Sequence, residues 1–142
     1  MFPSGLFLLS LVISLSSSFT ENVERSFLQN NPGLLFPLLG PGEPVHVSLP
    51  PPISFSDEIS SEQAFFLFRK IFRTYTTFEF FPEQGAVRGF EGGSFIFRAR
   101  WSFLSRNRNQ HVFLIFFYVR ARPGASEPEK LWTISEIRAE QL

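Results

Sequence analysis

The sequence has no cysteine, and it has very little histidine and aspartate, two other residue types that carry out catalysis and bind metals. The absence of cysteine excludes disulfides, thiolate nucleophiles, cysteine-ligated zinc and a lipid-modified N-terminal cysteine. His46 and His111 are the only histidines and Asp57 is the only aspartate, and no histidine or carboxylate pair has the spacing of a metal site. We therefore predict no metal and no cofactor.

The chain also lacks net charge, because 13 basic residues balance 13 acidic ones. A neutral domain has no overall field that would attract nucleic acid or anionic lipid. Arginines interleaved with aromatic residues between Arg98 and Arg122 could form a platform for single-stranded nucleic acid. Zero net charge and the export signal described next argue against that reading, so we predict no nucleic-acid partner.

No charged residue precedes Glu21, and Leu6 to Leu15 form an apolar run, LFLLSLVISL. Such a run has the length of a signal-peptide core and is shorter than the roughly 20 residues of a membrane span. Ser16 and Ser18 give the small-x-small pattern of a cleavage site, with cleavage after Ser18 or, as the second choice, after Thr20. The segment before the run has no lysine or arginine, and the alternative is an N-terminal core helix.

The sequence thus predicts a signal peptide at residues 1–20 and one domain at residues 21–142. The protein would be exported, either to a periplasm or into the medium. No stable membrane span would remain after cleavage.

Phenylalanine is abundant: the chain has 20, against 2 tyrosines and 2 tryptophans. A phenylalanine ring has no polar atom, so these rings must be buried together or form a contact surface. An aromatic core is the simpler expectation for a chain with room for one domain.

The pattern predicts helices first and strands afterwards. Thr20 would cap a helix from Glu21 to Asn30, and Ser60 with Gln63 forms a capping box before a helix that turns its phenylalanines inward. The first strand, Val45 to Leu49, would stop at three prolines and resume at Ile53. Further strands are expected at 76–81, 86–90, 94–104, 110–122 and 130–138. This order favours an α+β fold, with helices on one face of a curved antiparallel sheet.

The two longest strands flank an RNRN turn, which suggests a register with Phe97 opposite Phe117. One face then carries odd-numbered aromatic residues and would form the core. The other face carries the interface candidates Arg98, Arg100, Leu114, Phe116 and Tyr118. An aromatic patch edged with arginine is typical of a protein contact surface. Either the first half of the chain covers this face, or it binds a partner or a second copy.

Four residues are candidates for lining a ligand pocket: Tyr75, Trp101, His111 and Phe113. His111 is the most suggestive, because a histidine on the core face of a strand could act as a general base. The other interpretation is a structural histidine at the end of the sheet, since His111 lies next to the turn.

The chain resembles the nuclear-transport-factor-2-like superfamily, and in particular small exported bacterial members that are known only as a domain of unknown function. The resemblance covers about Glu21 to Leu142. It rests on the segments NNPGLLFPLLG, PVHVSLP, SSEQAFFLFRKIFRTYTTFEF, SFIFRARWSF, HVFLIFFYV and KLWTISEIRAEQL. The resemblance implies a cone in which a curved sheet wraps helices, sometimes around a pocket. The superfamily includes isomerases, dehydratases, binding modules and dimerisation domains, so the fold alone gives no function.

Two functional hypotheses remain. The first is a non-catalytic binding or interaction module for a protein partner or an apolar small ligand, formed as a homodimer. The alternative is a lyase or isomerase that uses a pocket in the cone, with His111 and Tyr75 as its polar groups.

Overall fold

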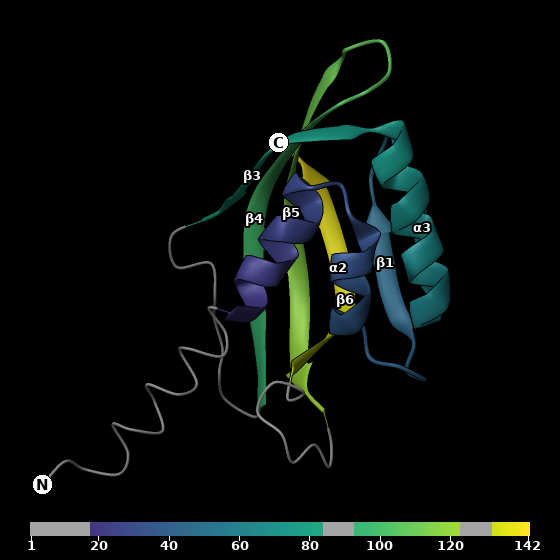
Figure 1. Cartoon of the computed structure of the whole chain (residues 1–142), viewed down its shortest axis with the longest axis vertical. Helices are drawn as coiled ribbons and strands as arrows, with labels where there is room; N and C mark the ends of the chain where they lie inside the picture. Colours follow the sequence, from purple (N-terminus) through teal and green to yellow (C-terminus); the bar gives the residue numbers. More distant parts are fainter. Residues whose placement is uncertain (1–17, 84–92, 123–131) are drawn as a thin grey trace, which may run out of the picture.

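The computed structural model describes residues 18–83, 93–122 and 132–142. These residues form two layers, a curved six-stranded sheet and a set of helices packed on one of its faces (Figure 1). The sheet is built from β1 (Val45–Leu49), β2 (Phe55–Ile59), β3 (Thr76–Pro82), β4 (Ser94–Leu104), β5 (Gln110–Ala121) and β6 (Trp132–Gln141). The predicted α+β class is confirmed. The expected strand at 86–90 and the apolar run at 6–15 lie outside the described residues.

The strand order is β2-β1-β6-β5-β4-β3, and neighbouring strands are antiparallel with one exception. β1 runs parallel to β6, with Val47 opposite Ile137. The sheet is therefore mixed, whereas the sequence predicted an antiparallel one. The difference arises because β1 joins the last strand of the chain, and such a long-range pairing leaves no local turn signal.

The first strand does not resume after the prolines, and that expectation was wrong. The chain reverses at residues 50–54, and β2 returns antiparallel along β1, with Leu49 opposite Phe55. The amide groups of Ile53 and Ser54 both donate to the carbonyl of Pro50, at 3.1 and 3.0 Å. Ser54 has a φ of 55°, in the left-handed region where turns place a residue to reverse the chain.

The central hairpin has the predicted register. Phe97 lies opposite Phe117 along an unbroken antiparallel ladder from Ser94–Arg120 to Leu104–Gln110. The odd-numbered aromatics face the helices, and Phe97, Trp101, Phe113 and Phe117 are all fully buried. The alternation of side chains along both strands therefore separates a core face from an outer face.

The helical layer consists of residues 18–28, α2 (Pro32–Leu35), the short 3₁₀ helix η1 (Phe36–Leu38) and α3 (Ser61–Thr74). The predicted capping box of α3 is confirmed, since the amide of Gln63 donates to Ser60 Oγ at 3.1 Å and the amide of Ser60 donates to Gln63 Oε1 at 2.9 Å. Thr20 lies inside the first helix and does not cap it, so that prediction was wrong. Phe19 also belongs to this helix, and its ring is buried against that of Phe95.

Asn30 fastens the end of the 18–28 helix to the α3–β3 junction. Its Nδ2 donates to the carbonyls of Phe72 and Tyr75, each at 2.9 Å, and its Oδ1 accepts from the amide of Thr77 at 3.2 Å. Asn30 adopts a left-handed conformation with a φ of 48°, which asparagine tolerates better than most residues. One side chain therefore joins three elements of the fold.

Within the described part of the chain, no helix combines the length and the apolar character needed to cross a bilayer.

Candidate interaction surface on the sheet

The face of the sheet turned away from the helices carries the predicted interface residues side by side. Strand pairing places Phe81 of β3 beside Arg100, and Arg100 beside Leu114. The next rows place Arg98 beside Phe116, and Ile96 beside Tyr118. From β6, Arg138 lies opposite Phe116. We call this set the outer patch: Phe81, Ile96, Leu114, Phe116, Tyr118, Arg98, Arg100 and Arg138.

Two arginines of the outer patch, Arg100 and Arg138, lie against aromatic rings. The guanidinium carbon of Arg138 is 5.7 Å from the ring centre of Phe116 and 5.6 Å from that of Tyr118. Arg138 Nη2 also donates to the hydroxyl of Tyr118 at 2.8 Å. The guanidinium carbon of Arg100 is 6.0 Å from the ring centre of Phe81. Contacts of this kind are attractive and hold a flexible side chain over an apolar surface.

Carboxylates border the patch. Arg100 Nε lies 3.0 Å from Glu79 Oε1, and Arg98 Nε lies 2.9 Å from Glu83 Oε2. Glu140 and Glu136 of β6 lie opposite Leu114 and Tyr118. The patch therefore combines rings, cations and anions, as the rim and core of a protein interface do.

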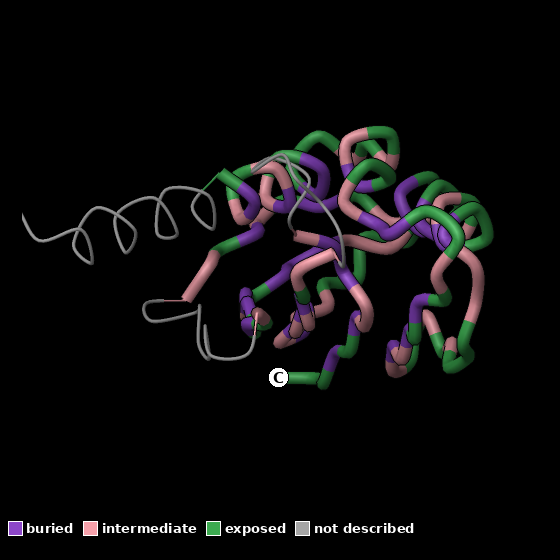
Figure 2. Tube along the Cα trace, turned by 90° about the horizontal axis from the view of Figure 1, so that it is seen from below, coloured by how far each residue is buried: buried purple, intermediate pink, exposed green. Residues whose placement is uncertain are grey.

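The described helices all lie on the opposite face of the sheet, as Figure 2 shows. Phe81 is 57% exposed and Ile96 is 36% exposed. The side chains of Arg98 and Arg100 are 38% and 47% exposed. The expectation that the first half of the chain covers this face is therefore wrong for residues 18–83, because the helices of that segment lie on the core face and its strands are part of the sheet (Figure 2).

A hollow of about 400 Å³ extends the patch toward one end of β4 and β5. Ile96, Tyr118, Arg120 and Ser135 line it. The register of β5 against β6 shifts here, between Tyr118 and Val119, and Ser135 Oγ donates to the carbonyl of Tyr118 at 3.2 Å. A bulge of this kind bends a strand and re-aims its side chains.

The four pocket candidates lie together, connected by Phe103. The ring of Phe103 is 5.2 Å from Tyr75, 5.4 Å from His111, 5.0 Å from Phe113 and 4.3 Å from Trp101. Trp101 and Phe113 are fully buried, and Trp101 Nε1 donates to Thr77 Oγ1 at 2.8 Å. His111 is half-buried and stacks on Phe103. Tyr75 borders a cavity that lies beside α3.

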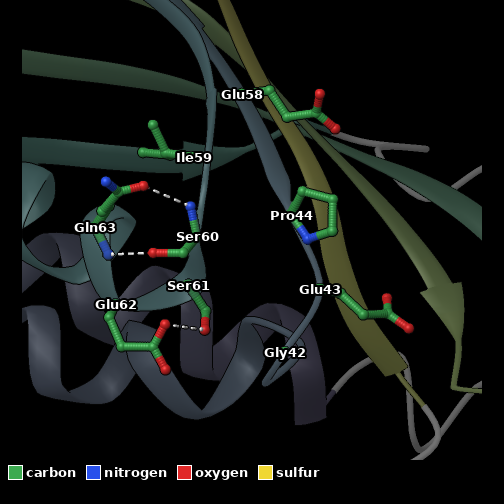
Figure 3. A pocket seen from close by; sticks show the side chains of 9 residues that line it. All are labelled: Gly42, Glu43, Pro44, Glu58, Ile59, Ser60, Ser61, Glu62 and Gln63. Carbon is green, nitrogen blue, oxygen red and sulfur yellow. Dashed lines mark hydrogen bonds between the residues drawn. The ribbon is translucent and has the colours of Figure 1, made fainter.

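A second hollow, of about 420 Å³, lies at the N-terminus of α3 (Figure 3). Glu43, Glu58 and Glu62 line it, and several of its polar groups already have partners within the chain. Ser60 and Gln63 form the capping box, Ser61 Oγ donates to Glu62 at 3.3 Å, and Glu43 pairs with Arg120. Among the described residues, no group of three or more histidine and acidic side chains is placed to hold a metal ion.

The five interface candidates from the sequence all lie in the patch, whereas Ile96, Phe81 and Arg138 were not among those candidates. Arg138 ends the strand expected at 130–138, and it lies between Ile137 and Ala139 in a stretch where apolar and polar residues alternate. The sequence did not show which strand lies next to this one, because that neighbour is set by pairing between distant segments.

No protein-family model matches this chain, and no curated protein does either. Solved structures do share its fold. A DUF4783 family protein from Bacteroides fragilis is 16% identical with a TM-score of 0.63, and the match covers 85% of this chain and 96% of that one. An NTF2-like protein of unknown function in nutrient uptake from Rhodospirillum rubrum is 10% identical with a TM-score of 0.61, covering 89% and 97%.

A ketosteroid isomerase-like protein from Erwinia carotovora atroseptica is 9% identical with a TM-score of 0.64, covering 94% and 95% of the two chains. The resemblance to nuclear-transport-factor-2-like proteins, including a family of unknown function, is thus confirmed at the level of the fold. Identities this low show the fold alone and transfer no activity.

Proposed function

We propose that the protein is a non-catalytic interaction module that associates with a second copy of itself through the outer patch. The observation that carries the proposal is the exposure of a mixed aromatic and arginine surface on the outer face of the sheet. Exposed apolar side chains gathered on one face of a soluble domain commonly mark a contact site. Aromatic residues and arginine are the residue types enriched in such sites.

The charges of the outer patch favour a second copy as the partner. Arg98, Arg100 and Arg138 stand among Glu79, Glu83, Glu136 and Glu140, so the surface carries both signs. A two-fold axis brings the same surface of two copies together, and such a surface must be complementary to itself. A surface with both signs can place cations opposite carboxylates across that axis.

Solution mass tests this proposal. We expect sedimentation equilibrium of the purified protein to give twice the chain mass, and Phe116→Asp to weaken the association about 100-fold, because a carboxylate would be buried at the centre of the contact. Phe66→Asp is the matched control, since Phe66 is 59% exposed on α3, on the other side of the molecule. A protein that is monomeric at all concentrations, or a dimer unaffected by Phe116→Asp, would refute the proposal.

We also propose that the protein is exported and that its leader is removed after Ser18. The packing of Phe19 supports this choice over cleavage after Thr20, because its ring is 5% exposed and lies 5.9 Å from Phe95. Cleavage after Thr20 would remove a core side chain. We expect N-terminal sequencing of the exported protein to begin at Phe19, and a sequence that begins at Glu21 would rule this site out.

The alternative of a lyase or isomerase gains no specific support from the packing. Rings occupy the space between the helices and the sheet, where Phe27, Phe68 and Phe117 are fully buried. The similar structure that is named a ketosteroid isomerase-like protein is 9% identical to this chain. We therefore do not propose an enzymatic function.

A further inference from the structure

A cavity of about 280 Å³ lies between α3 and the proline turn at residues 50–54, on the helical side of the molecule. Its walls are largely apolar and include Ile53, Phe55, Leu67, Ile71 and Tyr75. Ile71 belongs to the core, and the other four pack against the core while keeping part of their surface exposed. The cavity is therefore an apolar recess that remains open to solvent.

The proline turn forms a fixed wall of this recess. Tyr75 Oη donates to the carbonyl of Pro52 at 3.3 Å, and Gln141 Nε2 donates to the carbonyl of Pro51 at 2.5 Å. The amides of Ile53 and Ser54 close the turn onto Pro50. Bonds from the helix end, from the last strand and from within the turn hold it in one conformation. A site that is already in place loses little conformational entropy on binding.

Lys70 gives the recess a charge. It lines the cavity from an exposed position on α3, and no carboxylate of residues 18–83, 93–122 or 132–142 lies within ion-pair distance of it. Arg69 and Arg73 are its exposed neighbours on the same helix and carry the same charge. A cation at the rim of an apolar recess attracts a ligand with one anionic end and an apolar body.

We propose that this recess binds a small monocarboxylate whose apolar chain or ring lies on Ile53, Phe55 and Leu67 and whose carboxylate pairs with Lys70. The volume of about 280 Å³ is close to the lower end of the range for small-ligand pockets, about 300 Å³, which suits a ligand of about ten non-hydrogen atoms. The recess is separate from the outer patch, so the test of ligand binding and the test of the dimer can give independent results.

Isothermal titration with octanoate tests the proposal, with 1-octanol and octylamine as neutral and cationic analogues of similar length. We expect octanoate to bind with a Kd below about 1 mM and more tightly than either analogue. Lys70→Gln should weaken octanoate binding about tenfold and leave 1-octanol binding unchanged, since only the charge-assisted bond is lost. Arg69→Gln is the matched control: it removes a charge from the same helix but no group that lines the cavity, so it should weaken octanoate binding much less than Lys70→Gln does.

Leu67→Trp fills the recess and is expected to abolish binding of both octanoate and 1-octanol while the thermal unfolding transition is retained. Three results would overturn the proposal: no saturable binding of octanoate, octanoate binding that survives both Lys70→Gln and Leu67→Trp, or binding of 1-octanol or octylamine as tight as that of octanoate. Loss of the dimer in the Phe116→Asp variant would leave octanoate binding intact.

Discussion

Phe27→Ala is expected to lower the free energy of unfolding by about 3–5 kcal/mol, the range found when a large buried ring is removed. Phe27 is fully buried and is the centre of the aromatic core. Its ring lies 4.7 to 5.9 Å from five others, those of Phe68, Phe72, Phe80, Trp101 and Phe117. These rings come from α3, β3, β4 and β5, so truncation would leave a cavity where the helices meet the sheet.

Leu28→Ala provides the control, because Leu28 is the next residue of the same helix and is 45% exposed. Its effect should stay within about 0.5 kcal/mol, as for most surface substitutions. Urea denaturation of both variants measures the difference. Equal losses for the two variants would mean that residues 18–28 do not pack on the sheet in the way described.

The central hairpin could be predicted from sequence because its information is local. A four-residue polar turn separates two long alternating strands, and a shift of one residue would have turned the phenylalanine row toward solvent. The register with Phe97 opposite Phe117, and the division into two faces, follow from that constraint alone. The capping box at Ser60 is local in the same sense.

The parts that were not predicted depend on contacts between distant segments. The parallel pairing of β1 with β6 joins residues near position 47 to residues near position 137. The reversal at the prolines places β2 beside β1, and without it the recess next to Lys70 could not be foreseen. The capping preference of Thr20 did not mark the start of the first helix, since Phe19 and Thr20 both lie within it and Phe19 is buried.

The extent of the outer patch also could not be predicted from local sequence alone. Arg98, Arg100, Leu114, Phe116 and Tyr118 were assigned to one face from alternation within the hairpin, and the structure places them there. Phe81 and Arg138 join them only through pairing with β3 and β6. Alternation thus predicts which face a residue occupies, while the extent of a surface also requires the strand order.

The separation of the two faces of β5 is the claim on which both the core and the proposed interface depend. Phe116 and Phe117 are adjacent in the sequence and point to opposite sides of the sheet. Phe117 is fully buried, and Phe116 is half-buried beside Arg98 and Arg138. An aspartate at position 117 would be a charge without a partner in an apolar core, whereas at position 116 it would meet two arginines and water.

Denaturant unfolding of Phe117→Asp and Phe116→Asp, measured at a dilution where the protein is monomeric, is the most direct test of this claim. We expect Phe117→Asp to lose about 5 kcal/mol or more, enough to unfold many domains of this size. We expect Phe116→Asp to remain folded with a loss of about 1 kcal/mol or less. Equal losses, or a larger loss for Phe116→Asp, would contradict the two-faced sheet and the interaction surface built on it.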